Sequence, residues 1–174
     1  MTSLNLEATR TALIAIDLMP RIVDGDRAPH SGPEVRDRCV AITRALRAAG
    51  GLVVWVTVER PGEDPQPEGS GLAPECDPQP DDVRIVKRTW GAFHGTGLDE
   101  ALRAKGIETV VMGGIATNFG VESTARAADE HDYRVVSVSD AMTGLHAHAH
   151  DFAVGYVFPR LGPVVTTEEL LREL

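Results

Sequence analysis

The sequence has little of several features that would place it in a specialised class of protein. Only two of the 174 residues are cysteines, Cys39 and Cys76, which is too few for a disulfide framework. We expect Cys39 on a helix and Cys76 in a proline-rich loop, so we assign neither to a disulfide or to catalysis. No apolar run is long enough to span a bilayer, and residues 1–7 lack the pattern of a signal peptide. We therefore expect a cytoplasmic protein with no membrane partner.

Positive charge is also scarce. Lysine and arginine total 17 against 26 aspartates and glutamates, which gives a formal net charge of −9. This excess of negative charge argues against nucleic acid as the main partner, and a small anionic substrate would need locally placed cations. The remaining composition, 43% hydrophobic and 25% charged, is ordinary for a globular protein. A chain of this length predicts one domain, residues 1–174.

Short apolar runs alternate with helical patterns along the chain. The runs that predict strands span residues 11–17, 52–58, 83–87, 108–112, 133–138 and 164–165. The helical patterns span residues 34–49, 98–105, 118–131 and 146–158, and a last helix follows Thr166 with a capping box to Glu169. Residues 18–33 and 59–82 are rich in proline and glycine and predict loops. This alternation predicts an α/β fold, a doubly wound three-layer sandwich around a six-stranded parallel sheet.

Two of the predicted strands end in a charged residue. Asp17 ends the first strand and Lys87 ends the third. A charge at the end of a buried strand is costly unless it is paired or used, so Asp17 is a functional candidate. The alternative is that Asp17 only caps a helix or forms a turn.

Residues 110–128 predict a strand, a tight turn and a helix. A β-branched run ends at Gly113 and Gly114, and a small polar turn follows before the helical pattern begins. In a parallel sheet, ligands bind at such a junction because free N–H groups of the helix start point outward there. We expect the active site here, with Gly120 at the position where chemistry would favour a nucleophile.

These features together resemble the isochorismatase-like superfamily of cysteine hydrolases. The resemblance rests on Asp17, Lys87 and Gly120, together with residues 114–118 and 121–125, and extends from about residue 11 to 170. It implies the strand order 3-2-1-4-5-6 and a homo-oligomer, a dimer or tetramer. It also implies a cis peptide between Ile115 and Ala116, which would turn backbone N–H groups toward a substrate carbonyl.

The chain departs from the amidases of this family at the nucleophile. In those enzymes a cysteine stands at the position of Gly120, and the residues equivalent to Asp17 and Lys87 help to ionise it. Glycine offers no sulfur, so a thioester intermediate is excluded. Nicotinamidases also carry an Asp-x-His metal motif after the second strand, where this chain has residues 59–62, Glu-Arg-Pro-Gly. We therefore expect no metal and no cofactor.

Isochorismatases resemble this chain in lacking the nucleophile, and they hydrolyse a vinyl ether. That reaction needs a proton on the enol carbon and water on the resulting oxocarbenium ion, and Asp17 is the expected proton donor. Burial would raise the pKa of Asp17, whereas Lys87 would lower it. The larger of the two effects decides whether Asp17 acts as an acid.

The substrate is expected to be a small molecule with a ring, held by the turn and by aromatic side chains. The proposed contacts are Ile115, Ala116, Thr117, Asn118, Phe119, Trp90 and Phe93, with Arg60 or Arg84 for a carboxylate, and the first loop adds Arg21 and Ile22. The aromatic residues could instead pack in the core or at a subunit contact. Two functions remain open: a hydrolase without a thiol intermediate, or a catalytically idle member that binds a metabolite or protein partner through the same pocket.

Overall fold

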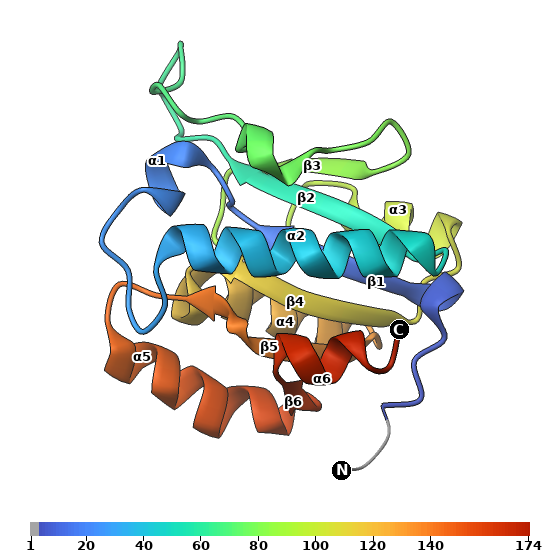
Figure 1. The fold of residues 1–174 in the computed structure, drawn as a ribbon. Helices are drawn as coiled ribbons and strands as arrows, with labels where there is room; N and C mark the ends of the chain where they lie inside the picture. Colours follow the sequence, from blue (N-terminus) through green and yellow to red (C-terminus); the bar gives the residue numbers. More distant parts are fainter. Residues whose placement is uncertain (1–3) are drawn as a thin grey trace.

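The computed structural model describes residues 4–174, and a six-stranded parallel sheet forms its centre (Figure 1). The strands lie in the order β3-β2-β1-β4-β5-β6. Their bounds are β1 Thr11–Ile16, β2 Leu52–Val58, β3 Val83–Lys87, β4 Thr109–Ile115, β5 Arg134–Thr143 and β6 Val164–Val165. The predicted α/β fold and its strand order are therefore confirmed.

Helices cover both faces of this sheet. Their bounds are α1 Pro20–Val23, α2 Gly32–Ala48, α3 Leu98–Ala104, α4 Glu122–Glu130, α5 Ala147–Phe152 and α6 Thr167–Leu171. In Figure 1, α2 and α6 lie in front of the sheet and α3 and α4 lie behind it. Within residues 4–174, no helix has both the length and the apolar character that crossing a bilayer requires.

The sheet separates two apolar cores because its central strands are covered on both sides. In β1, Ile14 and Ile16 face the core beneath α3 and α4, and Leu13 and Ala15 face the core beneath α2. Every residue of β1 is buried. This explains why the strand is a continuous apolar run and does not alternate with polar residues.

Several predicted boundaries were wrong. The segment 18–33, predicted as a loop, contains α1 and the first two residues of α2, a helix that Ser31 caps in a capping box with Glu34. The helix predicted over 118–131 begins with a π-helical turn, Thr117–Val121, and the one predicted over 146–158 passes into another, Ala153–Val157. These turns depend on what the segment packs against, which periodicity does not report.

Gly114 allows the end of β4 to lie against the end of β1. Its φ is +114°, and a Cβ atom there would lie 2.2 Å from the carbonyl oxygen of Ile16. Only glycine tolerates both the conformation and the close approach. The junction between β4 and the following turn is thereby held beside Asp17, which follows Ile16.

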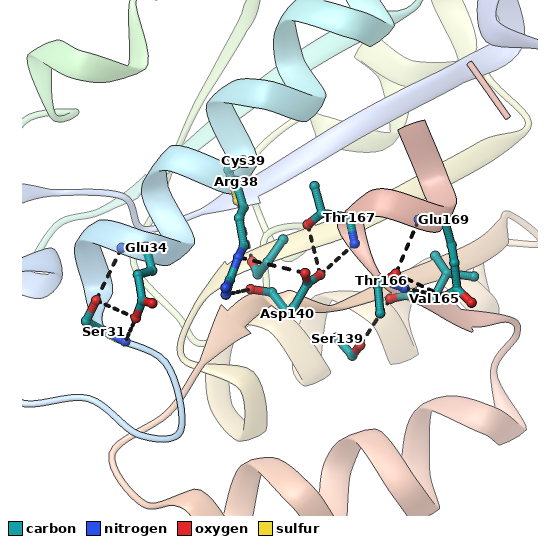
Figure 2. Close-up of polar contacts among 11 residues, drawn as sticks. Ser31, Glu34, Arg38, Cys39, Ser139, Asp140, Val165, Thr166, Thr167 and Glu169 are labelled. Atoms are coloured by element: carbon teal, nitrogen blue, oxygen red, sulfur yellow. Dashed lines mark hydrogen bonds and ion pairs between the residues drawn. The ribbon is translucent and has the colours of Figure 1, made fainter. Parts of the chain in front are cut away.

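Asp140 joins β5 to α6 and α2, as Figure 2 shows. Its Oδ1 accepts hydrogen bonds from the backbone N–H and the hydroxyl of Thr167 at 2.6 and 2.8 Å, and its carbonyl oxygen accepts one from Arg38 at 2.7 Å. Thr166 caps α6 in a capping box with Glu169, as predicted. These contacts fix the last helix on the face of the sheet that α2 also covers.

Candidate active site

Asp17 and Lys87 form a buried ion pair at the carboxyl edge of the sheet. The Lys87 Nζ lies 2.8 Å from the Asp17 Oδ2, and the two residues are 3% and 6% exposed. The Lys87 Nζ also donates a hydrogen bond to the carbonyl of Thr89 at 3.3 Å. Two charges separated by 70 positions in the sequence are in contact because β1 and β3 end at the same edge.

The Asp17 carboxyl favours its protonated form more than a free aspartate does. Burial is the largest cause and raises the pKa of Asp17 above its ordinary value of 3.8, while Lys87 and, less strongly, Arg21 oppose this rise. The Asp17 Oδ1 is buried and has no hydrogen-bond partner among residues 4–174. This oxygen is therefore the one free to carry a proton.

Gly120 faces this carboxyl from the turn that follows β4. A Cβ atom on Gly120 would lie 3.6 Å from the Asp17 Oδ2, 3.4 Å from the Trp90 carbonyl oxygen and 3.0 Å from the Ile16 Cγ2. The peptide bond between Ile115 and Ala116, just before this turn, is cis. The missing side chain of Gly120 is thus directed at the acid group.

A cavity of about 330 Å³ opens onto these groups. Its lining residues fall into a charged set, a set from the turn and a set of apolar walls. They are Asp17, Lys87 and Arg27; Ile115, Ala116, Phe119 and Gly120; and Ile22, Val58, Trp90 and Leu145, together with Thr89. The cavity therefore combines a proton-carrying group with an apolar wall suited to a ring.

The rings of Trp90 and Phe119 meet edge to face at the cavity, with centroids 4.8 Å apart. Trp90 is 63% exposed, so its ring borders the opening. Thr117 is buried and hydrogen-bonded to His150, and Asn118 is half-buried beside Gly144. Neither Thr117 nor Asn118 lines the cavity.

Phe93 and Arg60, two further expected contacts, do not line the cavity either. Phe93 stacks on His131, with ring centroids 5.0 Å apart, and packs against the core beneath α4. Arg60 is exposed in a loop that folds around Gln66, and it pairs with Glu63 at 3.6 Å. Both side chains follow local partners that sequence position does not reveal.

Arg27 was missed by the sequence reasoning and lines the cavity. It belongs to the loop between α1 and α2, within residues 18–33, which the sequence predicted as a loop. From the same segment we expected Arg21 and Ile22, which lie in α1; Ile22 does line the cavity. Arg21 instead donates hydrogen bonds to Ser70 and to the carbonyl of Val58.

Neither cysteine lines the cavity. Cys39 and Cys76 are buried and free. Burial raises the pKa of Cys76 to about 12 and that of Cys39 further, so neither thiol ionises readily. Residues 4–174 also hold no cluster of three or more histidine, cysteine, aspartate or glutamate side chains arranged for a metal ion.

Comparison with known proteins places this chain in a family. The family model described as the isochorismatase domain matches residues 11–169. An uncharacterized isochorismatase family protein of Bacillus subtilis, YwoC, is 37% identical over 191 residues, which cover 100% of this chain and 99% of that protein. The maleamate amidohydrolase of Pseudomonas putida is 31% identical over 124 residues, covering 70% of this chain and 58% of that protein.

A solved structure agrees over the whole length. An isochorismatase family protein from Burkholderia thailandensis superposes with a TM-score of 0.89 at 39% identity, covering 99% of this chain and 97% of that one. The family model over residues 11–169 and the 37% identity to YwoC both show the family. The chain therefore belongs to the isochorismatase family of hydrolases.

Proposed function

We propose that this chain hydrolyses a small metabolite without a covalent thiol intermediate, by vinyl-ether hydrolysis of the isochorismate type. The observation that carries the proposal is the buried pair of Asp17 and Lys87 facing Gly120, where a Cβ would lie 3.6 Å from the carboxylate. The cavity has a proton donor, Asp17, but position 120 carries no nucleophilic side chain. The chain would thus represent a subgroup of the family with glycine in place of the catalytic cysteine.

The proposed reaction uses Asp17 first as an acid. Its O–H bond breaks as a C–H bond forms at the terminal enol carbon, and the vinyl ether becomes an oxocarbenium ion. Water adds to the cationic carbon and returns one proton to the Asp17 carboxylate. In the resulting hemiketal the C–O bond to the ring breaks and the hydroxyl proton passes to the ring oxygen, which gives a ketone and an alcohol, for isochorismate pyruvate and a dihydroxylated ring acid.

Lys87 influences how readily Asp17 releases its proton. Its ammonium group, 2.8 Å from the Asp17 Oδ2, stabilises the carboxylate that remains after proton transfer, so the donor becomes more acidic during the reaction. Asp17 must still be protonated at the start, and its burial favours that form. Burial therefore helps Asp17 to hold its proton before the reaction, and Lys87 helps it to release that proton.

The second candidate function is ligand binding without catalysis. Gly120 supports it, because the loss of a nucleophile is also what an idle family member would show. The buried Asp17 and Lys87 argue against it, since a pure binding pocket gains little from two desolvated charges. Catalysis is therefore the proposal that we favour.

The test is a panel of substrates with a matched variant. Wild type should release pyruvate from isochorismate, and Asp17→Asn should abolish that release while Asp24→Asn, an exposed control, leaves it unchanged. Ready turnover of nicotinamide by the wild type would contradict the non-covalent mechanism. Absence of turnover, combined with a rise in Tm on adding isochorismate, would overturn catalysis in favour of binding.

A further inference from the structure

The charges that line the cavity do not cancel. The Lys87 charge is balanced by Asp17, 2.8 Å away, only when that carboxyl is ionised, and Arg27 is the third ionisable residue of the lining. Within residues 4–174, Arg27 takes part in no ion pair with an acidic side chain. The cavity is therefore cationic in a chain whose formal net charge is −9.

The Arg27 guanidinium has unused donors. Its Nη1 donates to the carbonyl of the neighbouring Asp26 at 2.8 Å. Its Nε is buried and has no hydrogen-bond partner among the described residues. A guanidinium carries five N–H donors in a fixed planar fork, and a buried donor without an acceptor is costly. The guanidinium fork therefore has donor capacity left for an acceptor that a ligand brings to the cavity.

The loop that carries Arg27 is fixed to the sheet. Ala28 and Gly144 exchange two backbone hydrogen bonds of 3.1 Å, and the Thr143 hydroxyl donates to the carbonyl of His30 at 2.7 Å. Figure 1 shows this loop, after α1, beside the segment that leads from β5 to α5. Because its backbone is held at residue 28, the arginine is placed at the cavity before a ligand binds, which lowers the entropic cost of binding.

Gly25 makes room for the side chain. A Cβ atom on Gly25 would lie 2.9 Å from both Nη atoms of Arg27. The guanidinium therefore lies across the turn directly over this glycine. Alanine at position 25 would displace it without changing any charge.

We propose that Arg27 recognises a carboxylate of the substrate and so restricts this enzyme to anionic metabolites. A carboxylate presents two oxygens in the geometry of the guanidinium fork. The rings of Trp90 and Phe119 border the remaining space, so a flat ring that bears one carboxylate fits the lining. This inference rests on the proposed function for the site, and it names the substrate class.

The experiment compares benzoate with benzamide, two probes of the same shape that differ in charge. By isothermal titration calorimetry at low salt, wild type should bind benzoate at least about tenfold more tightly than benzamide. Arg27→Gln should remove this preference, and Arg27→Lys should retain part of it. Arg44→Gln, which removes the same charge from the exposed face of α2, should behave as the wild type.

Gly25→Ala supplies the second variant. It keeps all charges but moves the guanidinium, so it should also reduce the benzoate preference. Equal binding of both probes by wild type, or a preference that survives Arg27→Gln, would overturn the assignment. Because these are binding measurements, they can be repeated in Asp17→Asn, so a failure of the proposed chemistry would leave the Arg27 result intact and distinguishable.

Discussion

The protonation of Asp17 sets the expected pH dependence of turnover. Burial raises the pKa of this carboxyl above 3.8, against the opposing effect of Lys87. Since the proposed acid acts in its protonated form, kcat/KM should be highest on the acidic side and should fall as pH rises through the raised pKa. The descending limb of a pH profile, measured with isochorismate, should therefore lie above pH 3.8.

Lys87→Gln tests whether Asp17 is the source of the descending limb of the pH profile. The variant removes the cation that lowers the pKa of Asp17, so the limb should move to higher pH even as the rate falls. Arg88→Gln, at an exposed neighbour paired with Glu59, should leave the limb in place. A limb that rises with pH would mean that Asp17 acts as a base.

Gly120→Cys tests whether a thiol is all that separates this site from an amidase. The new Sγ would extend from a Cβ lying 3.6 Å from the Asp17 Oδ2, so we expect turnover of nicotinamide, which wild type should lack. The Cβ would also lie 3.0 Å from the Ile16 Cγ2, and such overpacking should cost about 1–3 kcal/mol of stability.

Gly120→Ala is the matched control for that gain, because it brings the same crowding without sulfur. It should lower the Tm similarly and turn over no amide. If Gly120→Cys folds and remains inert toward amides, then Gly120 does not stand at the nucleophile position of the family.

The sequence predicted the paired charges but not the whole pocket. Asp17 and Lys87 could be found because each is the charged residue that ends a predicted strand, and parallel strands end at one edge of the sheet. Phe93 and Arg60 could not be placed, since the direction of a loop side chain depends on partners such as His131 and Glu63. Arg27 was missed for the same reason.

At the scale of elements, α5 supports the turn of the active site through one hydrogen bond. The Thr117 hydroxyl, in the π-helical turn, lies 2.8 Å from the Nδ1 of His150 on α5, and both residues are buried. Burial and the neighbouring His30 lower the pKa of His150 below its ordinary value of 6.5, with Asp151 acting in the opposite direction. The folded protein thus favours a neutral imidazole.

This predicts a loss of stability in mild acid. As pH falls below about 6.5, the unfolded chain takes up a proton at position 150 that the folded chain resists, so the free energy of unfolding decreases. His150→Gln should show a smaller decrease between pH 7 and 5 in chemical denaturation, whereas the exposed His148→Gln should match wild type. Equal pH dependence in all three would exclude His150 as the source.

The elements themselves were largely readable because their signals are local. Apolar runs bounded by glycine and proline gave the strands, and the Thr166 capping box gave the start of α6. The two π-helical turns and the four-residue α1 lack such signals. Two of these irregular segments line the cavity: α1 contributes Ile22, and the first π-helical turn contributes Phe119 and Gly120.

At the scale of the whole molecule, the sheet separates two apolar cores, each with its own side-chain packing. Leu46 of α2 and Leu102 of α3 are fully buried, but they belong to different cores on opposite faces. Replacing either by alanine should lower the free energy of unfolding by about 2–5 kcal/mol through lost burial and a residual cavity.

The two losses should add in the double variant, because the side chains share no contact across the sheet. We expect the sum of the single effects to match the double effect within about 0.5 kcal/mol in urea denaturation. A coupling energy larger than about 1 kcal/mol between the two substitutions would contradict the independence of the two cores, since it would require strain to pass through the backbone of β1 and β4. In that case a packing change beneath α3 would also disturb the Asp17 carboxyl, which follows β1 directly, and the pH profile of turnover would move with stability.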